Sequence, residues 1–402
     1  MSVIVQKYGG SSVADVDRIR TVAARVASAR SAGKEVVVVV SAMGDTTDEL
    51  IALAHRVTDD PPRRELDMLL TAGERIAMAL LSMALNARGV PAVSFTGSQS
   101  GIITNDAHTN ARIVEVRPYR IQDELLRGRV VIVAGYQGVS YRKEITTLGR
   151  GGSDTTAVAL AAALDAEACE IYSDVDGVYS ADPRLVPEAR RLSALSYEEM
   201  QELAEAGATV LNAQAVEFAK DRGIALFARA TAGGLGETIV RKLPPRAPGR
   251  VVGIASEARL VLASVASPDA SRLRAVLEEL DALETSGKEL LFRSAAPSHA
   301  SFVLSLENIH DFPRLRDALR ARWGDAVALR EGFGAVSAIG AGINASHRNL
   351  RAALAALEGI GPILGLATSS FRISFLLDEA NVGEAVRRLH AALIVHAVDA
   401  PR

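Results

Sequence analysis

The sequence predicts an α/β protein in which a doubly wound, mainly parallel sheet is followed by ferredoxin-like α+β regions. Three observations support this fold class. Aliphatic runs typical of strands buried on both faces alternate with helical segments through residues 1–243. The proline-rich stretch 244–249 then interrupts the chain and indicates a linker. In residues 250–402 the pattern changes to short strands and helices that recur as an internal repeat.

The first region repeats a unit of strand, glycine-containing turn and helix. Residues 3–6 form a short aliphatic strand, and the turn over 7–12 leads into a helix with apolar residues at helical spacing. The run 36–40 is a second strand, and the turn over 41–47 precedes another helix. The later elements expected here are a helix over 71–85, a strand and hairpin over 92–104, a strand at 130–134, a helix from 153, a strand at 169–174, a helix near 196–206 and a strand at 224–227.

The last region contains two similar copies of a strand followed by a helix. In the first copy a strand at 260–265 precedes a leucine-rich helix, and in the second a strand at 335–339 does the same. The second copy continues with strands at 363–367 and 371–377 and a further helix, which is a ferredoxin-like order. The glycines at 340–342 are interpreted as a tight turn.

Composition excludes several classes of function. The chain has 402 residues and a formal net charge of −3, and its dispersed lysines and arginines provide no basic face for nucleic acid. The single cysteine, Cys169, lies in an apolar strand and is interpreted as an inert thiol in a reducing compartment. The longest uninterrupted aliphatic run, 36–40, is too short to span a membrane. We therefore expect a cytoplasmic protein that binds small molecules, with no membrane partner and no metal site built from protein ligands.

The stretch 147–184 combines glycine turns, carboxylates and a core helix. The glycines between 149 and 152 allow a ligand to approach the backbone, and Ser153 or Asp154 is expected to cap the next helix. The N-terminus of that helix attracts anions. The following strand carries the loop through Arg184 to a carboxyl end, where ligands bind in open α/β sheets. The alternative is two ordinary turns around a core helix.

Two further positions could bind a ligand. Lys7 stands beside two glycines and two hydroxyl groups before a helix, a combination that can hold a phosphate chain, although a plain turn is an equal alternative. Glu74 is expected at the start of the helix over 71–85. There it either caps the helix or binds the ammonium group of a ligand.

With these elements placed, the chain resembles the aspartate kinase family, in which an amino-acid-kinase domain precedes two ACT regulatory domains. The resemblance rests on motifs that follow the family pattern in order. They are KYGGSSVA at 7–14, VSAMGDTTDEL at 40–50, LLTAGERI at 69–76, FTGSQSG at 95–101, TTLGRGGSDTTA at 146–157 and IYSDVDGVYSADPR at 171–184.

The resemblance implies transfer of the γ-phosphoryl group of ATP to the β-carboxylate of L-aspartate, with Mg²⁺ as a further cofactor. The product, 4-phospho-L-aspartate, would supply lysine, threonine and methionine biosynthesis. The residues implied in catalysis are Lys7, Arg150 and Asp154. Those implied in nucleotide binding are Lys7, Gly9, Gly10, Ser11, Ser173, Asp174, Tyr179, Asp182 and Arg184. Those implied in binding aspartate are Ser41, Thr47, Glu74, Arg150, Gly151, Gly152, Ser153 and Asp154.

The chemistry of this reaction agrees with the residues. A carboxylate acceptor is already ionised at neutral pH and needs no general base, so catalysis is mostly positioning and charge neutralisation. Arg150 offers a planar fork to a carboxylate, Glu74 meets the substrate ammonium, and Lys7 with Mg²⁺ offsets charge on the phosphoryl oxygens. Phosphate oxygens and water molecules can supply most of the ligands of the Mg²⁺ ion.

The chain departs from the family pattern in two places. A lysine of the family's nucleotide site is Thr209 here, and a proline-arginine pair is Ala213 and Gln214. The turns at 267–271 and 341–349 lack the Pro-Gly pair of amino-acid effector sites, so lysine or threonine binding is doubtful. We expect a homo-oligomer formed through the ACT-like region. The alternatives are a kinase of another amino-acid carboxylate and a non-catalytic regulatory partner of a kinase.

Overall fold

The computed structural model describes residues 2–149, 151–234, 236–243, 249–266, 269–282, 287–293, 299–306, 309 and 312–395. The chain divides into two compact units, and each is treated by itself below. The first unit consists of Met1–Val178, Arg191–Ala204 and Thr209–Pro244. The second unit consists of Tyr179–Arg190, Glu205–Ala208 and Pro245–Arg402.

The first unit is built on an eight-stranded sheet with the strand order β10-β12-β11-β9-β1-β2-β6-β3. All neighbouring strands are parallel except β11 and β12. The strands are β1 (Val3–Tyr8), β2 (Glu35–Val40), β3 (Ala92–Phe95), β6 (Val130–Ala134), β9 (Ala168–Ser173), β10 (Ala194–Leu195), β11 (Leu226–Ala230) and β12 (Glu237–Val240).

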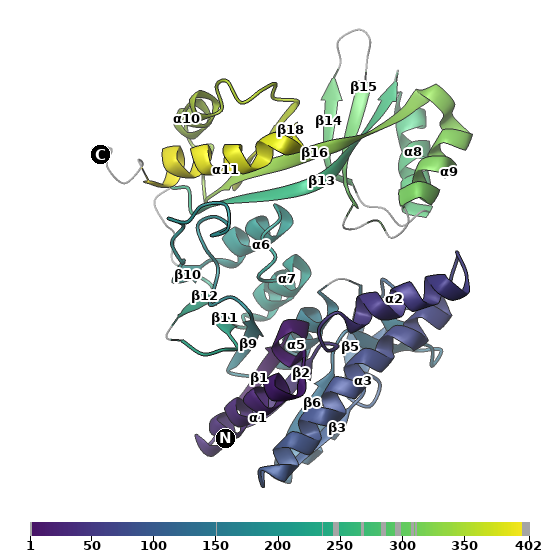
Figure 1. Cartoon of the computed structure of the whole chain (residues 1–402), viewed down its shortest axis with the longest axis vertical. Helices are drawn as coiled ribbons and strands as arrows, with labels where there is room; N and C mark the ends of the chain where they lie inside the picture. Colours follow the sequence, from purple (N-terminus) through teal and green to yellow (C-terminus); the bar gives the residue numbers. More distant parts are fainter. Residues whose placement is uncertain are drawn as a thin grey trace. The chain divides into compact units, whose positions relative to one another are not determined.

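Helices cover both faces of this sheet (Figure 1). The central strands β2 and β6 are aliphatic and almost wholly buried, because each contributes side chains to both faces. On one face they pack with β1 against α1 (Val16–Ser31) and α3 (Arg63–Ala87). On the other face α5 (Gly152–Ala163) contacts β1, β2 and β9, and α7 (Ala213–Arg222) packs on α5.

A four-stranded sheet in the first unit has the order β5-β4-β7-β8. Its strand β8 ends directly before the glycine turn that leads into α5, so this sheet positions that turn. Its strands are β4 (Ile102–Thr104), β5 (Ile113–Val116), β7 (Gln137–Ser140) and β8 (Ile145–Thr147). The remaining helices are α2 (Thr46–Val57), α4 (Tyr119–Leu126) and α6 (Tyr197–Glu205), with a 3-10 turn at Gly10–Val13.

Helix α3 has the length and apolar composition of a membrane span, although no long uninterrupted aliphatic run marks it in the sequence. Its apolar side chains do not form one continuous outer surface, because part of them packs in the core of the first unit. Ala77, Leu81 and Leu85 are fully buried there against α1, β2 and β6. The helix is therefore a core helix of this unit.

The second unit contains one antiparallel six-stranded sheet with the order β14-β15-β13-β16-β18-β17. Helices α8 and α9 pack with one end of the sheet, and α10 and α11 pack with the other. The strands are β13 (Gly253–Ala266), β14 (Gly287–Arg293), β15 (His299–Ser305), β16 (Val327–Ile339), β17 (Gly365–Thr368) and β18 (Arg372–Asp378). The helices are α8 (Ala270–Ala282), α9 (Phe312–Trp323), α10 (Arg348–Ala356) and α11 (Val382–His390).

The predicted fold class is confirmed, but several element boundaries were wrong. Lys7 lies within β1 rather than in the turn after it, and α3 begins at Arg63, a full two turns before the expected start at 71. The expected hairpin over 92–104 does not form. Instead β3 joins the eight-stranded sheet and β4 joins the four-stranded sheet, because each strand finds its partners elsewhere in the sequence.

Candidate active site

The carboxyl ends of β1, β2 and β9 meet at one edge of the eight-stranded sheet. The register places Tyr8 opposite both Val40 and Tyr172. The first residue after β1 and the first residue after β2 are each hydrogen-bonded to the end of a neighbouring strand: Gly9 N donates to the Tyr172 carbonyl at 3.2 Å, and Ser41 N donates to the Tyr8 carbonyl at 3.1 Å. The turn residues expected to bind ligands are thus brought together at the edge where ligands bind in such sheets.

Gly10 is required by the close approach of two of these turns. A Cβ atom at this position would lie 3.0 Å from the carbonyl oxygen of Ala42 and 3.1 Å from that of Gly44. Gly44 N also donates to the Gly10 carbonyl at 3.1 Å. The adjacent Gly9 lies next to the Lys7 ammonium group, since a Cβ at Gly9 would be 3.5 Å from Lys7 Nζ. A glycine pair of this kind lets a phosphate group approach the main chain.

Lys7 and Asp154 form an ion pair at this edge. Lys7 Nζ lies 2.6 Å from Asp154 Oδ1, and the two side chains are only 13% and 10% exposed. Lys7 comes from the carboxyl half of β1 and Asp154 from the first turn of α5. The pair therefore fixes an ammonium group at the start of a helix, where the helix dipole also favours anions.

The expected capping of α5 was wrong. The cap position is Gly151, which adopts a left-handed conformation with φ 71°, and no side chain caps the helix. Ser153 is buried against β6 instead, since a Cβ at Gly135 would lie 2.7 Å from Ser153 Oγ. Asp154 is committed to Lys7. The contact between Gly135 and Ser153 has no signature in the sequence beyond the position of Gly135 after a buried strand.

Glu74 lies in the middle of α3 rather than at its start, so the capping interpretation was wrong. The side chain is 2% exposed, and Oε1 accepts a hydrogen bond from Ala42 N at 3.1 Å. Oε2 has no hydrogen-bond partner among the described residues. Burial raises the pKa of Glu74 to about 7. A buried carboxylate oxygen without a partner is suited to a ligand cation such as an ammonium group.

Gly73 explains how Glu74 reaches the turn after β2. A Cβ at Gly73 would lie 2.7 Å from the Ala42 Cβ and 3.5 Å from Thr46 Cγ2. A glycine in the middle of a helix is unfavourable by about 1 kcal/mol relative to alanine, so its presence here indicates a close contact. Thr47, another expected substrate residue, lies in the first turn of α2 next to Thr46.

The remaining predicted residues are distributed as follows. Ser11 is exposed in the 3-10 turn, and Asp174 is exposed after β9. The hydroxyl of Ser173 accepts a hydrogen bond from Val175 N at 3.3 Å. Arg150 lies outside the described residues.

Part of the expected nucleotide group lies in the other unit. Tyr179, Asp182 and Arg184 belong to the second unit, whereas Ser173 and Asp174 belong to the unit that carries Lys7. Arg184 Nη2 lies 2.8 Å from Asp182 Oδ2, and hydrogen bonding from Arg184 lowers the pKa of the Asp182 carboxyl. Asp182 and Arg184 therefore form a local ion pair within the second unit.

The fold and the lysine–aspartate pair define a class of protein. Residues 2–227 match the sequence model of the amino acid kinase family, so the chain has the kinase domain of that family. The match covers the whole edge described above, from Lys7 to Asp154. It also reaches into β11, the strand next to β9.

Individual relatives show to which branch of the amino acid kinase family the chain is similar. The chain is 44% identical to an aspartokinase of Mycolicibacterium smegmatis, over 98% of this chain and 96% of that protein. It is 43% identical to an aspartokinase of Corynebacterium glutamicum, over 97% and 96% respectively. The crystal structure of E. coli aspartokinase III in complex with aspartate and ADP superposes with a TM-score of 0.82, at 25% identity, over 97% of this chain and 99% of that one. The chain belongs to the aspartokinase family, which confirms the resemblance inferred from its motifs.

Proposed function

We propose that this chain transfers the γ-phosphoryl group of ATP to the β-carboxylate of L-aspartate and releases 4-phospho-L-aspartate and ADP. The observation that supports this most directly is the nearly buried Lys7–Asp154 pair, which lies at the same sheet edge as the Gly9–Gly10 turn. Ala42 in the adjacent turn donates to Glu74 Oε1, and Glu74 Oε2 has no hydrogen-bond partner among the described residues. The positive charge of Lys7 suits a phosphoryl group, and the carboxylate of Glu74 suits an ammonium group. We propose a cytoplasmic enzyme whose product feeds lysine, threonine and methionine synthesis.

The transfer needs little chemistry from the protein. An oxygen of the ionised β-carboxylate bonds to the γ-phosphorus while the bond from that phosphorus to the β–γ bridging oxygen breaks, and ADP leaves. The acceptor is already deprotonated, so no side chain has to remove a proton. Lys7, held by Asp154, places a positive charge where negative charge spreads over the transferring group. The Gly9–Gly10 backbone accommodates the phosphate chain.

The residues present are compatible with Mg²⁺ bound together with the nucleotide. Bound Mg²⁺ would neutralise charge on the phosphate oxygens. Within the described residues no group of three histidine, cysteine or carboxylate side chains gathers. Phosphate oxygens and water are therefore the main ligands that we propose for it. The orientation of the phosphates would fall to Lys7 and the turn after β1.

Aspartate recognition is proposed to use both ends of the substrate. Glu74 receives the ammonium group, with Ser41 and Thr47 nearby in the sequence of the turn and helix after β2. The turn that contains Arg150 and the glycines at 151–152 receives a carboxylate. Ser11, Ser173, Asp174, Tyr179, Asp182 and Arg184 remain the proposed nucleotide contacts, and Thr209 replaces a lysine expected among them.

Incubation with ATP, Mg²⁺, L-aspartate and hydroxylamine is expected to yield aspartyl hydroxamate, because hydroxylamine traps an acyl phosphate. L-glutamate in place of L-aspartate is expected to give far less product. A higher yield with glutamate would favour the alternative, a kinase of another amino-acid carboxylate. Protein that binds both ATP and aspartate without forming hydroxamate would contradict the proposal and favour a non-catalytic regulatory partner.

We further propose that the second unit mediates homo-oligomerisation and that lysine and threonine regulate the enzyme weakly. Residues 267 and 268 of the first effector turn lie outside the described residues. The adjoining Asp269 accepts hydrogen bonds from Ser271 Oγ at 2.7 Å and from Arg272 N at 2.8 Å. Its carboxylate thus already uses a helix N-terminal amide that an effector carboxylate would otherwise need.

Lysine and threonine, singly or together, are expected to lower activity by less than about twofold at millimolar concentration and subsaturating aspartate. An effector that binds neither conformation strongly cannot shift the equilibrium between them. Activity titrations, with calorimetry for direct binding, measure this. Strong inhibition by either amino acid would show that the turns at 267–271 and 341–349 still form a competent site.

A further inference from the structure

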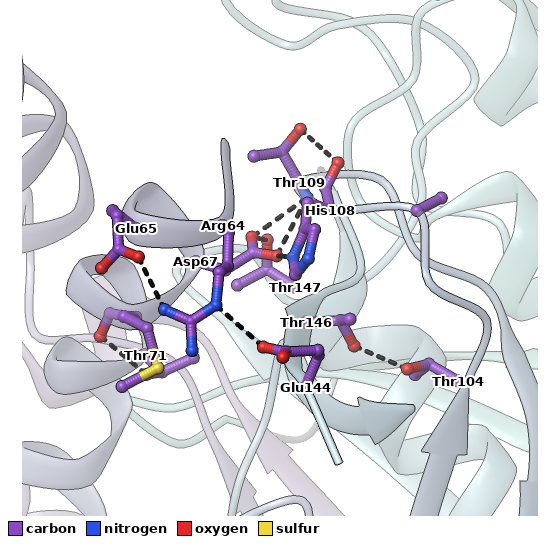
Figure 2. A network of polar contacts seen from close by, with 12 residues as sticks. Arg64, Glu65, Asp67, Thr71, Thr104, His108, Thr109, Glu144, Thr146 and Thr147 are labelled. Carbon is purple, nitrogen blue, oxygen red and sulfur yellow. Dashed lines mark hydrogen bonds and ion pairs between the residues drawn. The ribbon is translucent and has the colours of Figure 1, made fainter. Parts of the chain in front are cut away.

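A buried carboxylate outside the proposed substrate contacts joins two separate segments of the first unit. Asp67 projects from α3 and its side chain is fully buried. Thr147 Oγ1 donates to it at 2.6 Å and Thr109 N at 3.0 Å, and His108 Nδ1 lies 2.6 Å from it. Figure 2 shows Asp67 between the His108–Thr109 segment and Thr147. The first segment is the loop between β4 and β5, and Thr147 ends β8.

Both segments adjoin the glycine turn that leads into α5. Ala111 N donates to the Thr147 carbonyl at 2.8 Å, which fixes the loop against the end of β8. A Cβ atom at Gly149 would lie 3.0 Å from Asn110 Oδ1 and 3.5 Å from the Thr109 carbonyl oxygen. The loop therefore packs directly against the first residue of the turn 149–152. Asp67 holds both sides of this contact.

The energetics make Asp67 sensitive to displacement of either segment. Burial raises the pKa of the Asp67 carboxyl, and the hydrogen bonds from Thr147, His108 and Thr109 oppose that shift. A carboxylate taken out of water is stable only when its hydrogen bonds are made. If Thr147 moves away, the carboxylate loses a donor and remains buried. The Asp67 carboxylate thus holds both segments in place, because displacement of either one would leave it buried with fewer hydrogen bonds.

Asp67 also shares a helix with Glu74. Seven residues separate them, which is nearly two turns or about 10 Å along the axis, so both face the same side of α3. Glu74 is assigned to the substrate ammonium, and the turn 149–152 is assigned to a substrate carboxylate. One rigid helix consequently sets the distance between the groups that bind the two ends of the amino acid.

We propose that Asp67 is a positioning residue that fixes Gly149, at the start of the turn into α5, relative to Glu74 and thereby sets the affinity for the amino-acid substrate. This inference rests on the function proposed above. Asp67 does not contact the substrate itself. Its effect passes through Thr147 and the loop at 108–111, so a change in this network alters aspartate binding and leaves ATP binding largely intact.

Two neighbouring threonines in β8 provide a matched test. Thr146 and Thr147 are both fully buried, and each hydroxyl makes a 2.6 Å hydrogen bond. Thr147 bonds to Asp67, whereas Thr146 bonds to Thr104 (Figure 2). Valine replaces threonine with nearly the same shape and removes only the hydroxyl. Thr147→Val is expected to raise the KM for aspartate about tenfold, equivalent to about 1.4 kcal/mol, with the KM for ATP changed less than about twofold.

Thr146→Val is the control. It is expected to lower the melting temperature less than Thr147→Val, because no buried carboxylate loses a donor, and to leave the KM for aspartate unchanged. Thr147→Ser, which restores the hydroxyl, is expected to restore the KM for aspartate. The proposal would be overturned if the two valine variants had the same KM for aspartate. It would also be overturned if Thr147→Val raised the KM for ATP as much as the KM for aspartate.

A second variant covers the case in which Thr147→Val does not fold, and a binding measurement covers the case in which the protein shows no activity. If Thr147→Val does not fold, Asp67→Asn, which keeps the side-chain shape, takes its place with the same expected KM pattern. If the wild-type protein forms no hydroxamate, the proposed function fails. The dissociation constant of aspartate, measured by calorimetry on the same variants, then decides the positioning role alone, with a selective loss for Thr147→Val supporting it and equal constants contradicting it.

Discussion

Replacing Lys7 with methionine is expected to lower kcat for hydroxamate formation by about 10²- to 10³-fold, the range observed when one charge-stabilising donor is removed from an active site. The KM for aspartate is expected to change by less than about threefold, because Lys7 is assigned to the phosphoryl group and not to the amino acid. Steady-state kinetics with each substrate varied in turn measures both quantities. A fall in kcat of less than about tenfold would contradict the assignment.

The ion pair with Asp154 requires a second variant for this test. Removing the lysine leaves the Asp154 carboxylate nearly buried without its partner, which destabilises the fold as well as the transition state. The double variant Lys7→Met with Asp154→Asn removes the uncompensated charge and is expected to regain stability without regaining kcat. Lys34→Met serves as a control, since Lys34 forms a surface pair with Glu167 and is expected to leave kcat unchanged.

The fold and the sheet edge at which the candidate turns gather could be predicted from local patterns. Aliphatic runs such as 36–40 indicate strands buried on both faces, and turns rich in glycine after them indicate the carboxyl edge where ligands bind. The structure brings Gly9, Gly10 and Ser41 together at that edge as these patterns imply. The rules work here because parallel strands run in the same direction, so the turns that follow them all lie at the same edge of the sheet.

The partners of buried charges could not be predicted in this way. Lys7 and Asp154 are far apart in the sequence, and Asp67 and Thr147 are separated by 80 residues. Local patterns assign a residue to a helix or a strand but do not specify which distant group satisfies its charge. Asp67 carried one usable signal, since it lies on the same helical face as Glu74 among apolar residues of α3.

The division of the chain into two units could not be predicted fully from local sequence patterns either. The proline-rich stretch marks one change in the sequence, but the segments Tyr179–Arg190 and Glu205–Ala208, which precede it, belong to the second unit. Segments this short cannot be assigned to one unit or the other from their amino-acid composition. Their assignment follows from tertiary packing, as when Ile254 N donates to the Ser180 carbonyl at 2.8 Å.

Glu74 is expected to make the stability of the ligand-free protein depend on pH. Burial raises the pKa of Glu74 from the ordinary 4.5 to about 7, which favours the neutral form in the folded state. The stability from this group is fully present below about pH 4.5 and is lost as the pH rises through about 7. The loss amounts to about 3 kcal/mol. Glu74→Gln, compared with wild type by urea unfolding from pH 5 to 8, is expected to lack this decline.

The same group is expected to make aspartate binding depend on pH in the opposite direction. A substrate ammonium beside Oε2 stabilises the carboxylate, so binding below about pH 7 releases a proton from Glu74, and the KM for aspartate falls as the pH rises from 6 to 8. Glu74→Gln is expected to lower kcat/KM for aspartate about 10²-fold and to abolish this pH dependence. Glu199→Gln, which alters a buried acid on α6, is the matched control and is expected to leave both unchanged. A Glu74→Gln variant that keeps the wild-type pH profile of KM would show that another group binds the ammonium, because a glutamine side chain does not titrate.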